Sequence, residues 1–147
     1  RQEYARRYES DTLKLVEPYP GIPALLQQLK EQGMKLGVLS NKPDNMARAI
    51  VQALFGALPD QAHGQREGVP TKPDPTAVLA MAADLGVRPD RVLYVGDSGV
   101  DMATGKNAGM HPCGVRWGFR EEEELREQGA EFLVATAQEL FQVATRT

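Results

Sequence analysis

The sequence has little of several residues that mark common classes of protein. Its 147 residues include a single cysteine, Cys113, so no internal disulfide can form, which fits a reducing, cytoplasmic compartment. By default such a cysteine is a small, buried apolar residue. The two histidines, His63 and His111, lie far apart in the chain with no evident second ligand beside them, so we expect neither to be catalytic.

Clusters of one charge and long apolar runs are also missing. The net charge is −3 and Lys and Arg form no block, so we expect no nucleic-acid partner, because binding to backbone phosphates needs clustered cations. No apolar run approaches the roughly 18 residues of a membrane span, and the first residues, "RQEYARRYESD", lack the apolar core of a signal peptide. Neither G-x-G-x-x-G nor a Walker A sequence occurs, so a nucleotide-binding loop is not supported.

What the sequence does contain is an alternation of short apolar strands and helices. At 41% hydrophobic and 25% charged residues, its composition is that of a globular domain. Strands are expected at residues 34–40, 91–95, 112–117 and 131–134 and near Ala62, and helices at 1–14, 22–32, 42–55, 74–86, 98–109, 120–129 and 137–144. Asp74 suits the cap and Pro75 the first position of the fourth helix, which Gly86 would end. This order predicts the α/β class: a Rossmann-like parallel sheet flanked by helices.

Polar residues follow the predicted strands at the places where a parallel α/β sheet collects its chemistry. Such sheets bind ligands outside the carboxyl ends of their strands. The groups at these places are Ser40-Asn41-Lys42 after the first strand, Lys72 in "TKPDP" before a helix, and Gly96-Asp97-Ser98 with Asp101 after "RVLYV".

The two aspartates allow a structural and a functional interpretation. Ser98 and Asp101 have the spacing of a capping box, in which each side chain would bond a backbone N–H at the start of a helix. That arrangement is common, but it leaves Asp97 unexplained. Two carboxylates at a strand end also suit Mg²⁺, which takes oxygen ligands, needs only one or two carboxylates and keeps several waters. The two interpretations are compatible.

The remaining candidates would supply positive charge and hydrogen-bond donors. Lys72 is either a solvated loop lysine, as most lysines are, or an ammonium directed into the pocket of the aspartates. The prolines around it, including Pro73, restrict the path of the loop and can fix where Lys72 points. Ser40 and Asn41 either form a turn before the next helix or donate hydrogen bonds to phosphate oxygens.

Taken in order, these three groups on a βα scaffold resemble the haloacid dehalogenase superfamily, and more narrowly its phosphoglycolate phosphatase branch. The stretch "PYPGIPALLQQLKEQGMKLGVLSNKP" and the loop "GVRWGF" add to the resemblance, which covers essentially the whole chain. Each motif alone is weak, whereas the ordered set is specific.

The resemblance implies a role for each matched residue. Ser40 and Asn41 would bind the phosphoryl group, and Lys72 would stabilise the charge on phosphate and nucleophile. Asp97 would ligate Mg²⁺ directly, and Asp101 would hold the site through hydrogen bonds to the lysine or to a metal-bound water. The implied activity is Mg²⁺-dependent hydrolysis of a small phosphorylated metabolite through an aspartyl-phosphate, with Lys72 and Asp101 as the catalytic residues in this chain.

One family motif has no counterpart in the 147 residues. The family's first motif, Asp-x-Asp-Gly-Thr after the opening strand, supplies the nucleophile and the general acid/base. Asp11-Thr12 does not match it, because no apolar strand precedes it and no Asp stands two residues earlier. We therefore expect residues 1–16 to be the end of a helical cap and residues 17–147 to be an incomplete core that lacks its first strand. On this interpretation the chain is the C-terminal part of a longer protein.

Two other functions are compatible with the same residues. A catalytically inactive phosphate- and metal-binding module would carry this same absence of a nucleophile. A receiver-type phosphoacceptor domain also uses Mg²⁺, carboxylates, a hydroxyl and a lysine, but its acids come early in the chain, whereas Ser40 and Lys72 here precede Asp97. A core without its first strand would expose a sheet edge, so we also expect a homo-oligomer.

Overall fold

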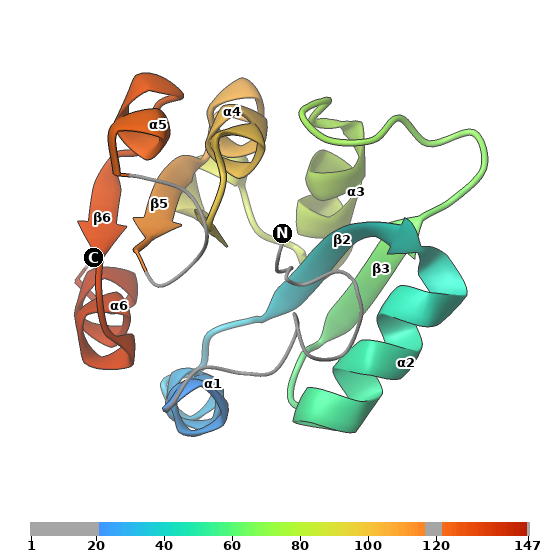
Figure 1. Ribbon diagram of the computed structural model, residues 1–147. Helices are drawn as coiled ribbons and strands as arrows, with labels where there is room; N and C mark the ends of the chain where they lie inside the picture. Colours follow the sequence, from blue (N-terminus) through green and yellow to red (C-terminus); the bar gives the residue numbers. More distant parts are fainter. Residues whose placement is uncertain (1–20, 117–121, 147) are drawn as a thin grey trace.

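The computed structural model describes residues 21–116 and 122–146. The helix predicted at 1–14, the cap assigned to 1–16 and the end of the strand predicted at 112–117 therefore lie wholly or partly outside the described residues. The elements, in chain order, are α1 (Ile22–Glu31), β2 (Gly37–Pro43), α2 (Asp44–Phe55), β3 (Gln61–Gln65), α3 (Thr76–Leu85), the short 3₁₀ helix η2 (Pro89–Arg91), β4 (Leu93–Gly96), α4 (Gly99–Asn107), β5 (His111–Val115), α5 (Glu122–Glu127), β6 (Phe132–Val134) and α6 (Ala137–Ala144) (Figure 1).

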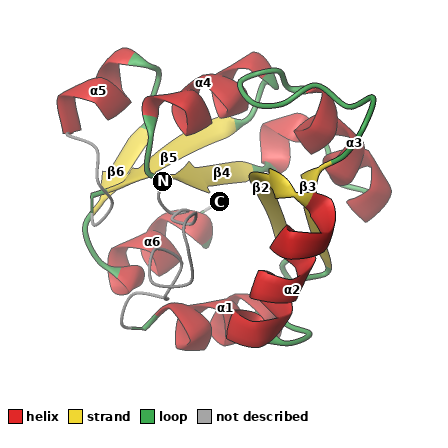
Figure 2. Ribbon diagram, turned by 45° about the vertical axis from the view of Figure 1, so that its right-hand side comes forward, coloured by secondary structure: helices red, strands yellow, loops and turns green. Residues whose placement is uncertain are grey.

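The strands confirm the predicted parallel α/β class. β2 pairs with β3, β4 with β5, and β5 with β6, and each of these pairings is parallel. The described strands form two groups, β2–β3 and β4–β5–β6, with no strand pairing between β2 and β4. In Figure 2, α3, α4 and α5 lie on one side of the strands and α1, α2 and α6 on the other, which gives three layers.

Apolar side chains from both helical layers hold the two groups of strands together. On the α3 side, Leu39 of β2 and Tyr94 of β4 pack against one buried cluster, which contains Val78, Ala82, Ala108 and Met110. On the other side, Leu36, just before β2, and Leu93 of β4 pack against the cluster of α1, α6, β5 and β6. The predicted burial of Cys113 is confirmed, since this side chain of β5 is 0% exposed.

Some helices and strands begin or end at other residues than predicted, where a short polar segment lies at the end of an apolar pattern. The strand predicted at 34–40 is β2, Gly37–Pro43, because Ser40, Asn41 and Lys42 continue its extended backbone instead of forming a turn. The prediction for the start of α3 was wrong by one or two residues. Pro75 is the N-cap and not the first helical residue, and Asp74, one position earlier, accepts a hydrogen bond of 2.8 Å from the Thr76 N–H. The predicted end at Gly86 is confirmed by its left-handed backbone, with φ of 74°.

No helix in the described part of the chain is both long and apolar enough to cross a membrane.

Candidate active site

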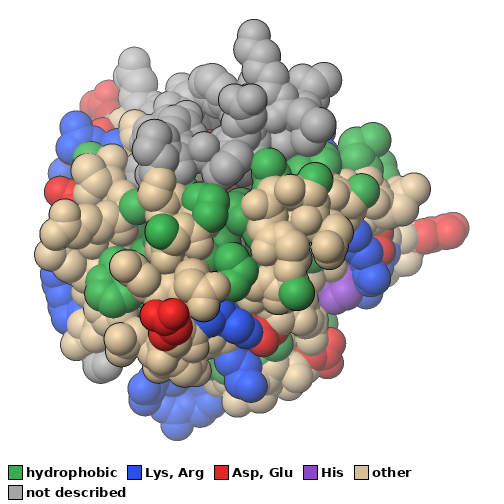
Figure 3. All heavy atoms as spheres, turned by 90° about the horizontal axis from the view of Figure 1, so that it is seen from below, with side chains coloured by type: hydrophobic (Ala, Val, Ile, Leu, Met, Phe, Trp, Pro, Cys, Tyr) green, Lys and Arg blue, Asp and Glu red, His purple; other side chains and the backbone are tan. Residues whose placement is uncertain are grey.

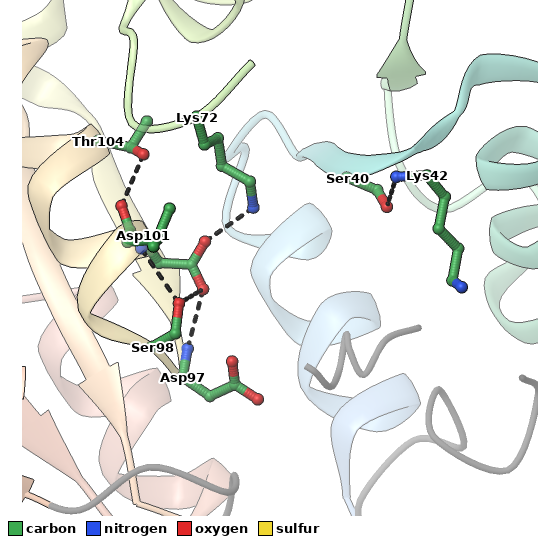
Figure 4. A network of polar contacts seen from close by, with 8 residues as sticks. Ser40, Lys42, Lys72, Asp97, Ser98, Asp101 and Thr104 are labelled. Atoms are coloured by element: carbon green, nitrogen blue, oxygen red, sulfur yellow. Dashed lines mark hydrogen bonds and ion pairs between the residues drawn. The ribbon is translucent and has the colours of Figure 1, made fainter. Parts of the chain in front are cut away.

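The Lys72 and Asp101 side chains meet where β4 ends and α4 begins, next to Asp97. Asp97 follows β4 directly, Asp101 lies in the first turn of α4, and Lys72 reaches them from the loop that precedes α3 (Figure 4). The Lys72 ammonium lies 2.7 Å from Oδ1 of Asp101, across 29 residues of sequence. The structure thus brings together two of the three groups that the sequence placed at strand ends.

Asp101 uses its second oxygen to organise the start of α4. Its Oδ2 accepts hydrogen bonds of 3.2 Å from the backbone N–H of Asp97 and from the Ser98 hydroxyl. The Ser98 hydroxyl in turn accepts the Asp101 N–H at 3.2 Å, which caps the helix as predicted. The return bond of the predicted capping box goes to the N–H of Asp97 and not to that of Ser98. Asp101 therefore caps α4 and pairs with Lys72 at the same time, so both sequence interpretations hold for it.

Gly96 allows this approach, and the sequence analysis gave it no role. A Cβ atom built on Gly96 would overlap the Asp101 side chain, its nearest neighbours being Cβ, Cγ and Oδ2 of that residue. Any larger residue at the end of β4 would push the carboxylate away from Lys72. The signal available in the sequence was the glycine itself, at the point where a buried strand runs into a pair of acids.

Lys72 is a buried cation and not the solvated loop lysine of the alternative interpretation. Its side chain is 14% exposed, and that of Asp101 is 13% exposed. Burial alone would lower the pKa of Lys72, but the charge and hydrogen bond of Asp101, together with Tyr94 and Asp97, raise it above the usual value. Burial raises the pKa of Tyr94 to about 12, so this phenol is neutral near pH 7 and the two carboxylates are what keep Lys72 charged. The Lys72–Pro73 peptide bond is cis.

Ser40 and Asn41 line one small pocket together with Lys72. They lie in an irregular part of β2: Leu39 pairs with His63 and Pro43 with Gln65, so three residues of β2 stand opposite Gly64 alone. This bulge releases the Ser40–Lys42 segment from regular pairing, and the Ser40 hydroxyl accepts the Lys42 N–H at 3.1 Å. Ser40 therefore lies across from the Lys72 ammonium in Figure 4, on the other group of strands.

Asp97 is the second carboxylate at the carboxyl end of β4. Its backbone N–H bonds Asp101, while its side chain points away from that residue in Figure 4. Among residues 21–116 and 122–146, no three His, Cys, Asp or Glu side chains are grouped closely enough to hold a metal ion by themselves. A metal ion bound through one carboxylate would have to complete its shell with waters or ligand oxygens, as hard cations do.

The histidines and the cysteine take no part in this site. His63 interacts with Arg48 and Gln61 beside α2, and His111 bridges Glu131 and the Asp90 carbonyl at the start of β5. Burial raises the pKa of the Cys113 thiol to about 12, so it is no nucleophile near neutral pH. That neither histidine is catalytic stays a prediction.

These features define the class, a parallel α/β protein with a buried lysine–carboxylate pair and a second aspartate at its strand ends, and comparison with known proteins gives the family. The family model described as haloacid dehalogenase-like hydrolase matches residues 2–109. The chain therefore belongs to the haloacid dehalogenase-like hydrolase family, as the resemblance predicted.

Relatives within this family are phosphatases. An N-acetylmuramic acid 6-phosphate phosphatase of Pseudomonas aeruginosa is 36% identical over 99% of this chain and 66% of its own length. A phosphoglycolate phosphatase of Rhodospirillum rubrum is 39% identical over 81% of this chain and 50% of its own length. A crystal structure from Lactobacillus delbrueckii subsp. bulgaricus, assigned provisionally as a phosphoglycolate phosphatase, is 38% identical with a TM-score of 0.83, and the match covers 87% of this chain and 54% of that one. The chain thus spans one half to two thirds of the length of these relatives.

Proposed function

We propose that this chain is the phosphate- and metal-binding part of a Mg²⁺-dependent phosphate monoester hydrolase. The observation that carries the proposal is the buried Lys72–Asp101 pair, held at 2.7 Å beside Asp97 and facing the pocket of Ser40 and Asn41. Three properties needed for phosphoryl transfer meet there: a fixed positive charge, hydrogen-bond donors and a carboxylate for a hard cation. The names of the relatives support a phosphorylated metabolite as substrate.

In this proposal each residue has a separate task. Lys72 neutralises negative charge on the phosphoryl group, and Asp101 positions Lys72 and keeps it protonated. Ser40 and Asn41 donate hydrogen bonds to phosphoryl oxygens. Asp97 would hold Mg²⁺, which supplies further positive charge to the same oxygens when bound.

The nucleophile and the general acid/base of such a reaction are the two groups that the 147 residues do not supply by motif. In the haloacid dehalogenase resemblance, a carboxylate from the first motif attacks phosphorus, the P–O bond to the alcohol breaks, and water then hydrolyses the aspartyl-phosphate. We therefore expect the 147-residue chain to bind phosphate and to have no appreciable turnover by itself. An upstream coding sequence with an apolar strand ending in Asp-x-Asp would favour the enzyme over an inactive binding module.

Phosphate binding is tested by NMR titration of the isotope-labelled chain with inorganic phosphate in the presence of Mg²⁺. We expect the amide signals of Ser40 and Asn41 to shift in a saturable manner, and Lys72→Met to abolish the shifts. Lys30→Met removes another ion-paired lysine, on α1, where it pairs with Asp60 at 2.7 Å, and serves as the control. Shifts that persist in Lys72→Met and vanish in Lys30→Met would contradict the proposed site.

Turnover is tested with p-nitrophenyl phosphate and the pure chain. We expect no hydrolysis above the buffer rate. Mg²⁺-dependent hydrolysis that Asp97→Asn abolishes would mean that the nucleophile lies within these residues and has been misplaced here.

A further inference from the structure

The loop that carries Lys72 is held mainly by its own contacts. Residues 67–74 lie between β3 and α3 and include two prolines, which have no backbone N–H. The N–H groups of Val69 and Asp74 each bond a carbonyl three residues earlier in the chain. Within the described part of the chain, one hydrogen bond reaches the backbone of this loop from another element. The position of Lys72 therefore depends on few contacts.

Asn107, the last residue of α4, makes that hydrogen bond. Its side-chain Nδ2 donates to the carbonyl of Pro73 at 3.1 Å, across 34 residues of sequence. Pro73 directly follows Lys72, so the bond holds the backbone next to the point from which the lysine side chain extends. The ammonium at the other end of that side chain is held at 2.7 Å by Asp101 (Figure 4). Lys72 is therefore held at both ends by residues of α4.

α4 can serve as a fixed support because it packs closely on two strands. A Cβ atom built on Gly105 would lie 3.1 Å from Cβ of Tyr94 in β4 and 3.3 Å from Cγ of Pro112 in β5, so the helix backbone is in tight contact with both. Asp101 and Asn107 are six residues apart on this helix, which corresponds to about 9 Å along its axis. The two contacts to the lysine loop thus start from well-separated points of one rigid element.

The Asn107 hydrogen bond should matter more for the position of Lys72 than for the stability of the fold. Asn107 and Pro73 are both exposed, so their hydrogen bond competes with water and contributes little to folding. A lysine side chain, however, has several rotatable bonds and loses much conformational freedom when it is fixed on a ligand. A lysine that is fixed before the ligand arrives loses less of that freedom on binding.

We propose that Asn107 is a positioning residue that holds Lys72 in place for phosphate through the carbonyl of Pro73. The inference rests on the proposed function, because it assumes that the phosphate contacts Lys72. Asn107 acts through Lys72 and contacts no ligand itself. It extends the candidate site from the start of α4, where Asp101 lies, to the end of the same helix.

The test follows phosphate affinity and the Lys72 ammonium in the same samples. The isotope-labelled chain is titrated with inorganic phosphate in the presence of Mg²⁺, and the side-chain ammonium signal of Lys72 is observed by ¹⁵N NMR and assigned by its loss in Lys72→Met. In Asn107→Ala we expect phosphate to bind about threefold to fivefold more weakly. The ammonium signal should broaden, because its protons exchange with water faster once the loop moves. The urea unfolding midpoint should stay close to that of the wild type.

Three further variants make the test specific. Asn107→Gln keeps an amide donor on a longer side chain and should restore part of the affinity. Asn107→Ser has too short a side chain to reach the carbonyl and should behave like Asn107→Ala. Gln27→Ala removes an exposed amide on α1 that bonds Glu31 of its own helix at 3.4 Å, and should bind phosphate as the wild type does. A urea unfolding curve of each variant verifies that it is folded.

The outcomes separate this inference from the function on which it rests. If phosphate binding depends on Lys72 but is unchanged in Asn107→Ala, the Asn107 inference is wrong and the phosphatase proposal stands. If Asn107→Ala loses affinity while the Lys72 ammonium signal is unchanged, the loss does not act through Lys72 and the inference is also wrong. If both Asn107→Ala and Asn107→Ser fail to fold, the role of Asn107 is structural and the inference is wrong. If the wild-type chain binds no phosphate, both proposals fail.

Discussion

Removing one partner of the Lys72–Asp101 ion pair should be one of the most destabilising single changes in the described core. Its charges lie 2.7 Å apart and are 14% and 13% exposed. At an effective dielectric constant of about 20, charges at that separation attract by about 6 kcal/mol, and the loss of hydration of both groups offsets much of this gain. Removing one partner leaves the other buried charge without compensation, for which about 3–5 kcal/mol is typical.

The two partners should not respond equally to mutation. In Lys72→Met, Asp101 still accepts hydrogen bonds from Ser98 and from the Asp97 N–H, so we expect a loss of about 2–3 kcal/mol. In Asp101→Asn, Lys72 loses its nearest counter-charge and α4 loses part of its cap, so we expect about 3–5 kcal/mol.

A double-mutant cycle measures the interaction itself. The free energy of unfolding is obtained from urea titrations followed by circular dichroism, for the wild-type chain, both single variants and the double variant. We expect the double variant to be less destabilised than the sum of the single variants by more than about 1 kcal/mol, because it carries no unpaired charge. Additivity within about 0.5 kcal/mol would mean that the pair is not formed in solution, and the reasoning about the site would be refuted.

Three other perturbations have defined outcomes. Gly96→Ala should destabilise the chain by about 1–3 kcal/mol and weaken phosphate binding, because the new methyl group displaces Asp101; an unchanged urea midpoint would contradict the close packing seen there. Glu131 raises the pKa of His111 above its usual 6.5, so their pairing stabilises the fold fully below pH 6.5 and is lost as pH rises through the higher folded value. Glu131→Gln should therefore cost under about 1 kcal/mol at pH 5.5, both side chains being nearly half exposed, and nothing at pH 9. The pKa of Asp60 is lowered by its lysine partner and then by a backbone N–H, so its contribution is complete above pH 3.8 and disappears as pH falls further; Asp60→Asn should cost about 1 kcal/mol at pH 7 and nothing at pH 2, as urea midpoints at the two pH values will reveal.

The fold class could be predicted because its signals are local. Gly86 ends α3, Ser98 caps α4, and apolar runs without polar alternation mark the buried strands. Hydrophobic periodicity and helix-capping residues were therefore enough to predict most elements. The errors occurred where a tertiary contact determines the local backbone structure. Ser40 reads as a turn residue by propensity, yet the extended bulge against β3 keeps it in a strand.

The residues of the candidate site could be proposed from the sequence, but the contacts between them could not. The rule that parallel strands collect their chemistry at one end placed Lys72 beside the aspartates, and the ion pair with Asp101 agrees with it. No rule of spacing could show that Gly96 must be small for Asp101 to reach its partners.

The absence of strand pairing between β2 and β4 in the described chain has a consequence for a ligand bound in the pocket of Ser40, Asn41 and Lys72. Among the described strands, no ladder of backbone bonds crosses this break, and the contacts described across it are between apolar side chains. The contact between β2 and β4 should therefore be the most easily deformed part of the described core. Backbone amides of β2 and β4 next to the break should exchange hydrogen faster than amides within either group of strands. A phosphate bound to both Ser40 of β2 and Lys72 near β4 would link the two groups of strands. Phosphate binding should therefore slow amide hydrogen exchange on both sides of the break and raise the melting temperature of the chain.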